Sequence, residues 1–243
     1  MIEVIGLNKS FNDRQILFDI HAQFVSGKPN LVIGASGSGK SVLFKCLVGL
    51  LIPESGQILY ENHDFLSMPY DDKLKLRKQI GMLFQNNALF DSLTVEENVE
   101  FPLKMFSSMS AQERKHRVNE CLSMVNLVNS NHKFPAEISG GMKKRVGIAR
   151  AIALNGKYLF CDEPNSGLDP LTSRVIDDLI SQLTADLHMT TVVNSHDMKT
   201  VKDIGEHIIF IYQGKKWWEG SKSEIDEARL SNPELNAFFQ ASF

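Results

Sequence analysis

A phosphate-binding loop is the feature of this sequence that most restricts how the chain folds. Residues 34–41 read GASGSGKS, which matches G-x-x-x-x-G-K-[ST] at every fixed position. A short apolar run, residues 30–33, precedes the loop, and residues 41–51 follow it with apolar side chains at helical spacing. Loops of this kind join a buried strand to the N-terminus of a helix, so the context predicts a strand–loop–helix unit of an α/β fold.

The chemistry of this loop suits a nucleoside triphosphate. Glycines let backbone N–H groups approach phosphate oxygens, and the helix N-terminus adds the positive end of its dipole. Lys40 is predicted to reach the β and γ phosphates, and the Ser41 hydroxyl to ligate Mg²⁺. The alternative is a glycine-rich turn before a helix that binds no ligand. The residues predicted to bind the nucleotide here are Gly34, Ala35, Ser36, Gly37, Ser38, Gly39, Lys40 and Ser41.

An apolar strand that ends in two acids supplies the second half of such a site. Residues 157–163 read KYLFCDE, which places Asp162 and Glu163 at the carboxyl end of the strand. Asp162 is predicted to hold Mg²⁺, directly or through water. Glu163 faces differently and is predicted to orient the attacking water as general base. Taken alone, two solvated acids would be the simpler interpretation, but a phosphate-binding loop in the same chain favours the catalytic one.

Strand and helix signals divide the chain into segments. Between residues 94 and 155 helical stretches with one polar face prevail, and strands alternating with helices return from residue 157. We therefore predict an α/β core with a mainly parallel sheet. Its expected segments are a catalytic core over residues 1–85 and 156–220, an inserted helical subdomain over 86–155 and a helical tail over 221–243. Within them we expect strands over 1–7, 15–25, 80–84, 158–161, 190–194 and 207–212, and helices over 71–79, 111–125, 143–154 and 170–187.

Composition excludes several classes of protein. The 243 residues are 43% hydrophobic and 23% charged, which is ordinary for a globular protein and argues against disorder. A formal net charge of −3 gives no global basic surface, so we expect no nucleic-acid partner. No stretch approaches the ~18 apolar residues of a membrane-spanning helix, and no signal peptide is expected at the N-terminus. Three cysteines far apart predict a reducing compartment.

Further motifs follow the phosphate-binding loop in a recognisable order. Residues 138–142 read ISGGM before a helix, residues 162–170 read DEPNSGLDP, and residues 195–197 read SHD. This order resembles the ATP-binding-cassette (ABC) ATPases over nearly the whole chain. The resemblance implies a single ABC domain: a P-loop NTPase (RecA-like) core with a mainly parallel sheet, an N-terminal antiparallel β portion and an inserted α-helical subdomain. It also implies ATP and Mg²⁺ as cofactors and a homodimer that encloses two ATP molecules.

The resemblance implies roles for three residues outside these first motifs. Phe11 matches the aromatic residue that stacks on adenine, although a core phenylalanine at a strand end is the alternative. Gln85 matches the glutamine that senses the γ-phosphate and Mg²⁺, with an exposed loop amide as the alternative. His196 matches the switch histidine at the γ-phosphate. The implied catalytic residues are Glu163, His196, Lys40 and Gln85, and the implied metal ligands are Ser41, Gln85 and Asp162.

The ISGGM segment matches the family's signature motif. Ser139, Gly140 and Gly141 offer N–H groups at a helix start, and in the family they cap the γ-phosphate held by the second subunit. Met142 stands where the family usually has glutamine, so an amide is missing there. Asp169 matches the loop that couples the two sites, and it is also expected to cap the following helix.

One further segment indicates a branch of the family. Residues 82–99 read MLFQNNALFDSLTVEENV and, with the SGGM signature, are similar to ATPase subunits of Mla-type (Mce-associated) phospholipid transporters. This implies a subunit that hydrolyses ATP at the cytoplasmic face of the inner membrane, where it drives lipid transport through a separate permease with a lipid-binding Mce-type component. The alternatives are a regulatory ABC clamp without solute transport and an importer or exporter ATPase for another substrate. In the family this segment borders the groove for a permease helix, while Leu83 and Phe84 are expected in the core.

Three aromatic residues lie near the C-terminus, at Phe238, Phe239 and Phe243. Exposed aromatic side chains at a chain end are a liability. We therefore expect them to dock, on this chain or on a dimer partner, rather than fray.

Overall fold

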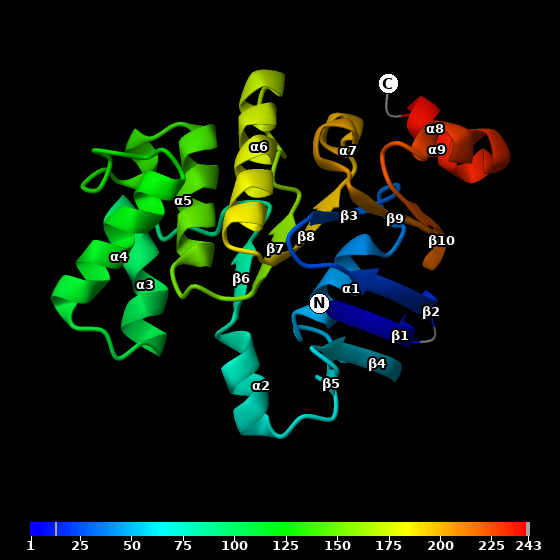
Figure 1. Ribbon diagram of the computed structural model, residues 1–243, viewed down its shortest axis with the longest axis horizontal. Helices are drawn as coiled ribbons and strands as arrows, with labels where there is room; N and C mark the ends of the chain where they lie inside the picture. The colour runs from blue at the N-terminus through cyan, green and yellow to red at the C-terminus, as the bar shows by residue number, and fades with distance from the viewer. Residues whose placement is uncertain (13, 242–243) are drawn as a thin grey trace.

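Two β-sheets form the centre of the computed structural model, which describes residues 1–12 and 14–241 (Figure 1). The larger sheet has the order β10-β9-β3-β8-β7-β6, and its neighbours pair in parallel except β9 and β10. The predicted mainly parallel sheet is therefore confirmed. Its strands are β3 (Pro29–Ile33), β6 (Ile80–Leu83), β7 (Tyr158–Asp162), β8 (Thr190–Ser195), β9 (His207–Tyr212) and β10 (Lys215–Gly220).

The smaller sheet is the N-terminal antiparallel portion that the resemblance implied. Its order is β2-β1-β4-β5, and every neighbouring pair is antiparallel. A helix, α1 (Lys40–Leu47), contacts β2 of this sheet and β7 and β8 of the larger one, and its Phe44 ring meets Phe160 edge-on at 5.2 Å. The two sheets therefore share one core around α1. The strands are β1 (Ile2–Phe11), β2 (Arg14–Phe24), β4 (Ser55–Tyr60) and β5 (His63–Asp64).

Helices α3, α4 and α5 lie together at one end of the molecule (Figure 1). Thr94 and Ser110 begin α3 and α4 with capping boxes that Glu97 and Glu113 complete, as helix-start chemistry favours. The division into a core and a helical subdomain at residues 86 and 155 stays a prediction. The helices before the tail are α2 (Tyr70–Arg77), α3 (Val95–Phe106), α4 (Ala111–Met124), α5 (Gly140–Ile152), α6 (Pro170–Asp186) and α7 (Met198–Ile204), with a 3₁₀ turn at Pro135–Glu137.

Three of the elements that differ from the sequence-based expectation have a local cause. Strand β1 does not end at residue 7, because its pairing with β2 continues to Phe11 past irregular steps. Helix α5 begins at Gly140 rather than residue 143, because the Ser139 hydroxyl caps it. Strand β10 was not predicted, since it is a half-exposed edge strand without an apolar run. Gln213 and Gly214 both have positive φ (47° and 76°), which matches the tight hairpin turn that joins β9 to β10.

The predicted helical tail is present as α8 (Ile225–Ser231) and α9 (Pro233–Ala241). Leu235 and Phe239 are buried, and the Phe238 ring lies 5.4 Å from that of Phe210 in β9. Docking of these aromatic residues on their own chain is therefore confirmed, and fraying is wrong. Phe243 lies outside the described residues.

A polar cluster fastens the β10 edge strand to its sheet. One ring nitrogen of His207 lies 2.9 Å from a Glu219 carboxylate oxygen, and the other lies 2.9 Å from the Asn30 side-chain oxygen. Lys216 Nζ donates to the second Glu219 oxygen at 2.6 Å. The His207 contact, with Lys216, lowers the pKa of Glu219 to about 2 against the opposing effect of burial.

The Glu219→Gln variant is expected to be less stable than the parent at pH 7, by about 1 kcal/mol for a partly exposed charged hydrogen bond. Because folding lowers the pKa of Glu219, its contribution is present above the unfolded value of 4.5 and is lost as pH falls toward about 2. The stability difference should therefore shrink between pH 5 and pH 3, as measured by urea unfolding. A difference that is constant with pH would contradict this pairing. Exposed Glu206, changed to Gln, is the control.

Candidate functional site

The phosphate-binding loop lies between β3 and α1, at the carboxyl edge of the large sheet. Gly34 has φ 150°, and a Cβ there would lie 2.2 Å from the Ile211 carbonyl oxygen, so only glycine fits. Gly39 has φ 106° and begins α1 with no side-chain cap. Within the described residues no side chain accepts from the first N–H groups of α1, and those of Lys40 and Ser41 are available to an anion.

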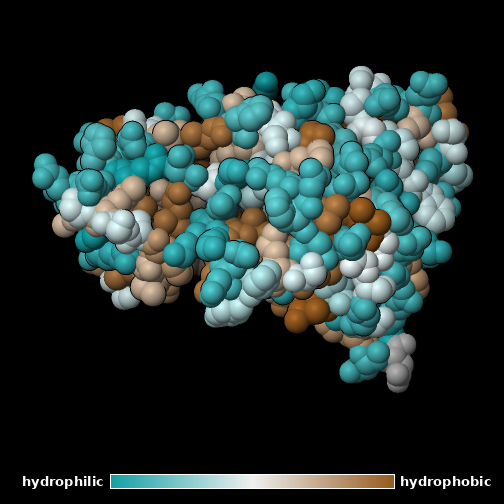
Figure 2. Space-filling view, turned by 60° about the horizontal axis from the view of Figure 1, so that its bottom comes forward, coloured by the Kyte–Doolittle hydropathy of each residue, from teal (hydrophilic) through white to brown (hydrophobic). Residues whose placement is uncertain are grey.

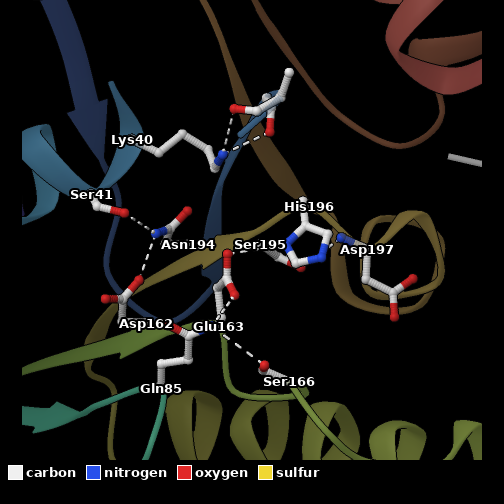
Figure 3. A network of polar contacts seen from close by, with 12 residues as sticks. Lys40, Ser41, Gln85, Asp162, Glu163, Ser166, Asn194, Ser195, His196 and Asp197 are labelled. Atoms are coloured by element: carbon white, nitrogen blue, oxygen red, sulfur yellow. Dashed lines mark hydrogen bonds and ion pairs between the residues drawn. The ribbon is translucent and has the colours of Figure 1, made fainter. Parts of the chain in front are cut away.

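Lys40 lies folded over this loop (Figure 3). Its ammonium donates to the carbonyl oxygens of Gly34 at 2.7 Å and Ala35 at 3.0 Å. Burial lowers the pKa of Lys40, while the Glu163 and Asp162 carboxylates oppose that change. The Ser38 hydroxyl in the same loop is buried without a hydrogen-bond partner in the described part of the chain. Phosphate oxygens would meet the needs of both groups, because the ammonium can exchange carbonyl acceptors for stronger charged ones.

Phe11 lies beside the loop, as the resemblance implied. It lines a cavity of about 360 Å³ together with Arg14, Ile16, Val42 and residues of the loop. Its side chain is 42% exposed, so the alternative of a core phenylalanine is wrong. Lys9 Nζ lies 5.1 Å from the ring centroid. An exposed aromatic face in the same cavity as the phosphate-binding loop suits stacking of a nucleotide base.

Two predicted residues, Gln85 and His196, contact the predicted base Glu163 (Figure 3). It follows β7 with φ 47°, a left-handed conformation that turns it away from the strand path of Asp162. Gln85 Nε2 donates to one carboxylate oxygen at 2.7 Å, and His196 Nδ1 lies 3.0 Å from the other. Ser166 Oγ accepts a longer bond from Gln85, at 3.4 Å. Both carboxylate oxygens are thus oriented by neighbours, which is the arrangement a general base requires.

Asp162 and Ser41 are brought together by a residue that sequence reasoning missed. Asn194 Nδ2 donates to Asp162 Oδ1 at 2.6 Å and to Ser41 Oγ at 3.5 Å. The Asn194 side-chain oxygen is buried and has no partner within the described residues. A carboxylate and a hydroxyl that converge this closely are oxygen ligands of the kind Mg²⁺ prefers, so the residues fit the metal. A polar residue at the end of an apolar strand, directly before Ser195 and His196, was the available signal.

The signature residues lie apart from the phosphate-binding loop. Ser139 caps α5 by accepting from the Met142 N–H at 3.2 Å. A Cβ at Gly141 would lie 2.6 Å from Thr172 Cγ2, so glycine allows α5 to approach α6 closely. Asp169 accepts from the Thr172 N–H at 3.0 Å, which confirms that it caps α6. Among the described residues, no hydrogen bond joins the signature to the loop of the same chain.

A large groove opens beside Gln85. Its volume is about 990 Å³, and Figure 2, which brings this side forward, shows hydrophobic residues in hollows between hydrophilic ones. Leu83 is buried as expected, but Phe84 is 39% exposed and lines the groove, so its placement in the core is wrong. The apolar lining includes Leu74, Met82, Phe84, Phe90, Phe101 and Phe106, and the charged lining residues are Asp71, Lys75, Arg77, Lys78 and Arg150.

Residues 17–166 match the family model described as ABC transporter. A probable ribonucleotide transport ATP-binding protein, mkl, of Mycobacterium leprae is 37% identical over 212 residues, which are 87% of this chain and 61% of that protein. The methionine import ATP-binding protein MetN of Corynebacterium jeikeium is 40% identical over 90% of this chain and 58% of its own length. The chain thus spans about three fifths of the length of these curated relatives.

Solved structures are similar over more of their length. A dimeric ATP-binding cassette in a post-hydrolysis state with ADP and Pi has a TM-score of 0.81 and 32% identity, and the match covers 91% of this chain and 99% of that one. The structure of cbiO1 from Clostridium perfringens, part of the ABC transporter complex cbiONQ, has a TM-score of 0.85 and 28% identity, with 98% of each chain covered.

Proposed function

This chain belongs to the ABC transporter family, and from that premise we propose that it is the subunit that hydrolyses ATP to drive a membrane transporter. The observation that carries the proposal is that Gln85 and His196 both contact Glu163 at the carboxyl edge of the large sheet. The phosphate-binding loop with Lys40 follows β3 at the same edge. A structural role does not require an oriented carboxylate beside a phosphate-binding loop, whereas phosphoryl transfer to water does.

In the proposed reaction, Glu163 takes a proton from water as the water oxygen attacks the γ-phosphorus. The bond from the γ-phosphorus to the bridging oxygen breaks, and ADP and phosphate leave. Gln85 and His196 hold the two carboxylate oxygens, while Lys40 binds the β and γ phosphates in place of its present carbonyl partners. When bound by Ser41, Asp162 and Gln85, Mg²⁺ supplies positive charge that neutralises the phosphates.

We propose that two copies of the chain form the working unit. Ser139, Gly140 and Gly141 offer backbone N–H groups at the start of α5 but make no hydrogen bond to their own phosphate-binding loop within the described residues. The signature of each copy would then complete the site of the other. A similar cassette was solved as a dimer, which supports this assembly.

The groove beside Gln85 is the proposed contact with the permease. No helix in the described part of the chain is long and apolar enough to cross a membrane. An apolar groove lined by more cations than carboxylates suits an amphipathic helix of a membrane partner that carries acidic residues. The resemblance of residues 82–99 to Mce-associated ATPase subunits implies the cytoplasmic face of the inner membrane, which we propose as the location of the chain.

The proposed cargo is lipid, specifically phospholipid. The support is the segment at residues 82–99 and the SGGM signature, which are similar to those of Mce-associated transporters. Another cargo is the alternative, because the relatives above are named for ribonucleotide transport and for methionine import. We propose that the partner subunits select the cargo. A regulatory clamp without transport would use the same site.

Affinity capture of the chain from solubilised membranes tests the partner and the cargo. We expect a multi-pass permease, an Mce-type lipid-binding protein and phospholipid, identified by mass spectrometry. Phe101→Asp, which puts a charge into the apolar groove, should reduce permease recovery at least about tenfold. Val128→Asp is the matched control, because Val128 is exposed and lies outside the groove. Capture of a permease without a lipid-binding protein would contradict the lipid proposal, and capture of no permease would contradict transport.

A further inference from the structure

Lys144 is a buried cation in the signature helix α5 that no predicted role accounts for. Its residue is 2% exposed, which is rare for lysine. Its Nζ donates to the backbone carbonyl of Gln85 at 2.5 Å, and the Glu163 carbonyl oxygen lies at 3.5 Å. These are the same two residues whose side chains are joined at 2.7 Å. One ammonium therefore touches the backbone on both sides of the hydrogen bond that orients the proposed base.

Close packing of α5 brings Lys144 to this position. Gly147 lies one turn further along α5, and a Cβ there would lie 2.6 Å from Leu83 Cδ1, so glycine permits the approach to β6. Gln85 follows β6 by two residues. The backbone of Gln85 is thereby within reach of a long side chain on α5, and a shorter one would leave its carbonyl without this partner.

Burial of the Lys144 charge costs free energy of desolvation, which its contacts must offset. Desolvation lowers the pKa of Lys144, and nearby groups that include Cys161, Glu163 and Asp162 oppose the change. An apolar side chain of similar volume would avoid the desolvation. An apolar residue could not donate to the carbonyl oxygens of Gln85 and Glu163, and these two residues form part of the proposed catalytic site.

We propose that Lys144 is a positioning residue for ATP hydrolysis, which fixes the backbones of Gln85 and Glu163 and ties them to the signature helix. The inference rests on the proposed function of the site. Lys144 lies five residues after Ser139, about 7.5 Å along the helix axis at ~1.5 Å per residue. A shift of α5 when Ser139 meets the phosphate of the partner subunit therefore moves the ammonium that holds this subunit's own base.

The test compares phosphate release by the full chain with Lys144→Met, which keeps the length and removes the ammonium. We expect kcat to fall at least about tenfold while KM for ATP stays within about twofold, because Lys144 touches the base and not the phosphate-binding loop. Lys144→Arg keeps a charged donor and should recover a large part of kcat. Lys143→Met is the matched control, since it removes one charge from the same helix and Lys143 has no side-chain hydrogen bond or ion pair in the described structure.

A double-mutant cycle separates positioning from a general loss of stability. If Lys144 acts through Gln85, Lys144→Met should add much less to Gln85→Ala than it costs alone. If the Lys144→Met variant does not fold, Lys144→Gln replaces it in the cycle with Gln85→Ala, because the glutamine side chain is too short to reach the Gln85 carbonyl. Unchanged kcat in a folded variant, or effects that multiply independently, would overturn the inference while parental activity upholds the proposed function. Absence of ATP hydrolysis by the parent would overturn both.

Discussion

Replacement of Glu163 by glutamine is expected to abolish steady-state ATP turnover while ATP still binds. Glutamine has nearly the same shape but no carboxylate to accept the proton of the attacking water. Positioned general bases contribute about 10²- to 10⁴-fold, so kcat should fall by at least about 10²-fold. Lys40 and the phosphate-binding loop are untouched, and ATP affinity should stay close to that of the parent. Phosphate release and equilibrium binding of a fluorescent ATP analogue measure the two effects.

The same variant should trap the proposed dimer. When bound ATP is not hydrolysed, the two chains stay joined through the nucleotides, and size-exclusion chromatography with ATP and Mg²⁺ should show twice the mass. Glu206→Gln changes an exposed carboxylate whose one ion pair among the described residues is with Lys28, and it should behave as the parent. Turnover that survives in the Glu163→Gln variant would remove Glu163 as the base. A monomer with ATP bound would instead contradict the dimer.

Much of the fold was predictable because its signals are local. The phosphate-binding loop needs a buried strand before it and a helix after it, and β3 and α1 are both present. β7 was predicted from its apolar run, and β9 at its exact bounds, because parallel strands buried on both faces are continuously apolar. β10 lacked that signal. The β10 strand is held in place by its pairing with β9 and by the contact between His207 and Glu219, which lie twelve residues apart.

The site was predictable in its parts but not in its connections. Motifs named Gln85, Glu163 and His196 singly, and the structure joins them through hydrogen bonds between residues up to 78 positions apart. Asn194 and Lys144 carried no motif, because each acts through a neighbour whose position the fold alone decides. Burial of a polar side chain inside an apolar strand or helix face is their common sign, and burial is a property of tertiary structure.

Lys40→Ala is expected to lose nucleotide affinity itself, in contrast to Glu163→Gln. Lys40 now donates to two carbonyl oxygens, and a nucleotide replaces them with charged phosphate oxygens. Hydrogen bonds to charged groups contribute about 1.5 to 3 kcal/mol each, so the Kd for ATP should rise by at least about tenfold. Without nucleotide, the Lys40→Ala variant should be nearly as stable as the parent, because it also removes a buried charge whose pKa burial lowers.

The pattern across nucleotides identifies the phosphates that Lys40 contacts. AMP carries neither the β nor the γ phosphate, so Lys40→Ala should leave its weak binding nearly unchanged while ATP and ADP lose affinity. Lys45→Ala is the matched control, since Lys45 lies on the same helix α1 with an exposed side chain. Isothermal titration calorimetry with the three nucleotides gives the comparison. An equal loss for AMP would mean that the variant distorts the whole loop, and an unchanged Kd for ATP would remove Lys40 from the phosphate site.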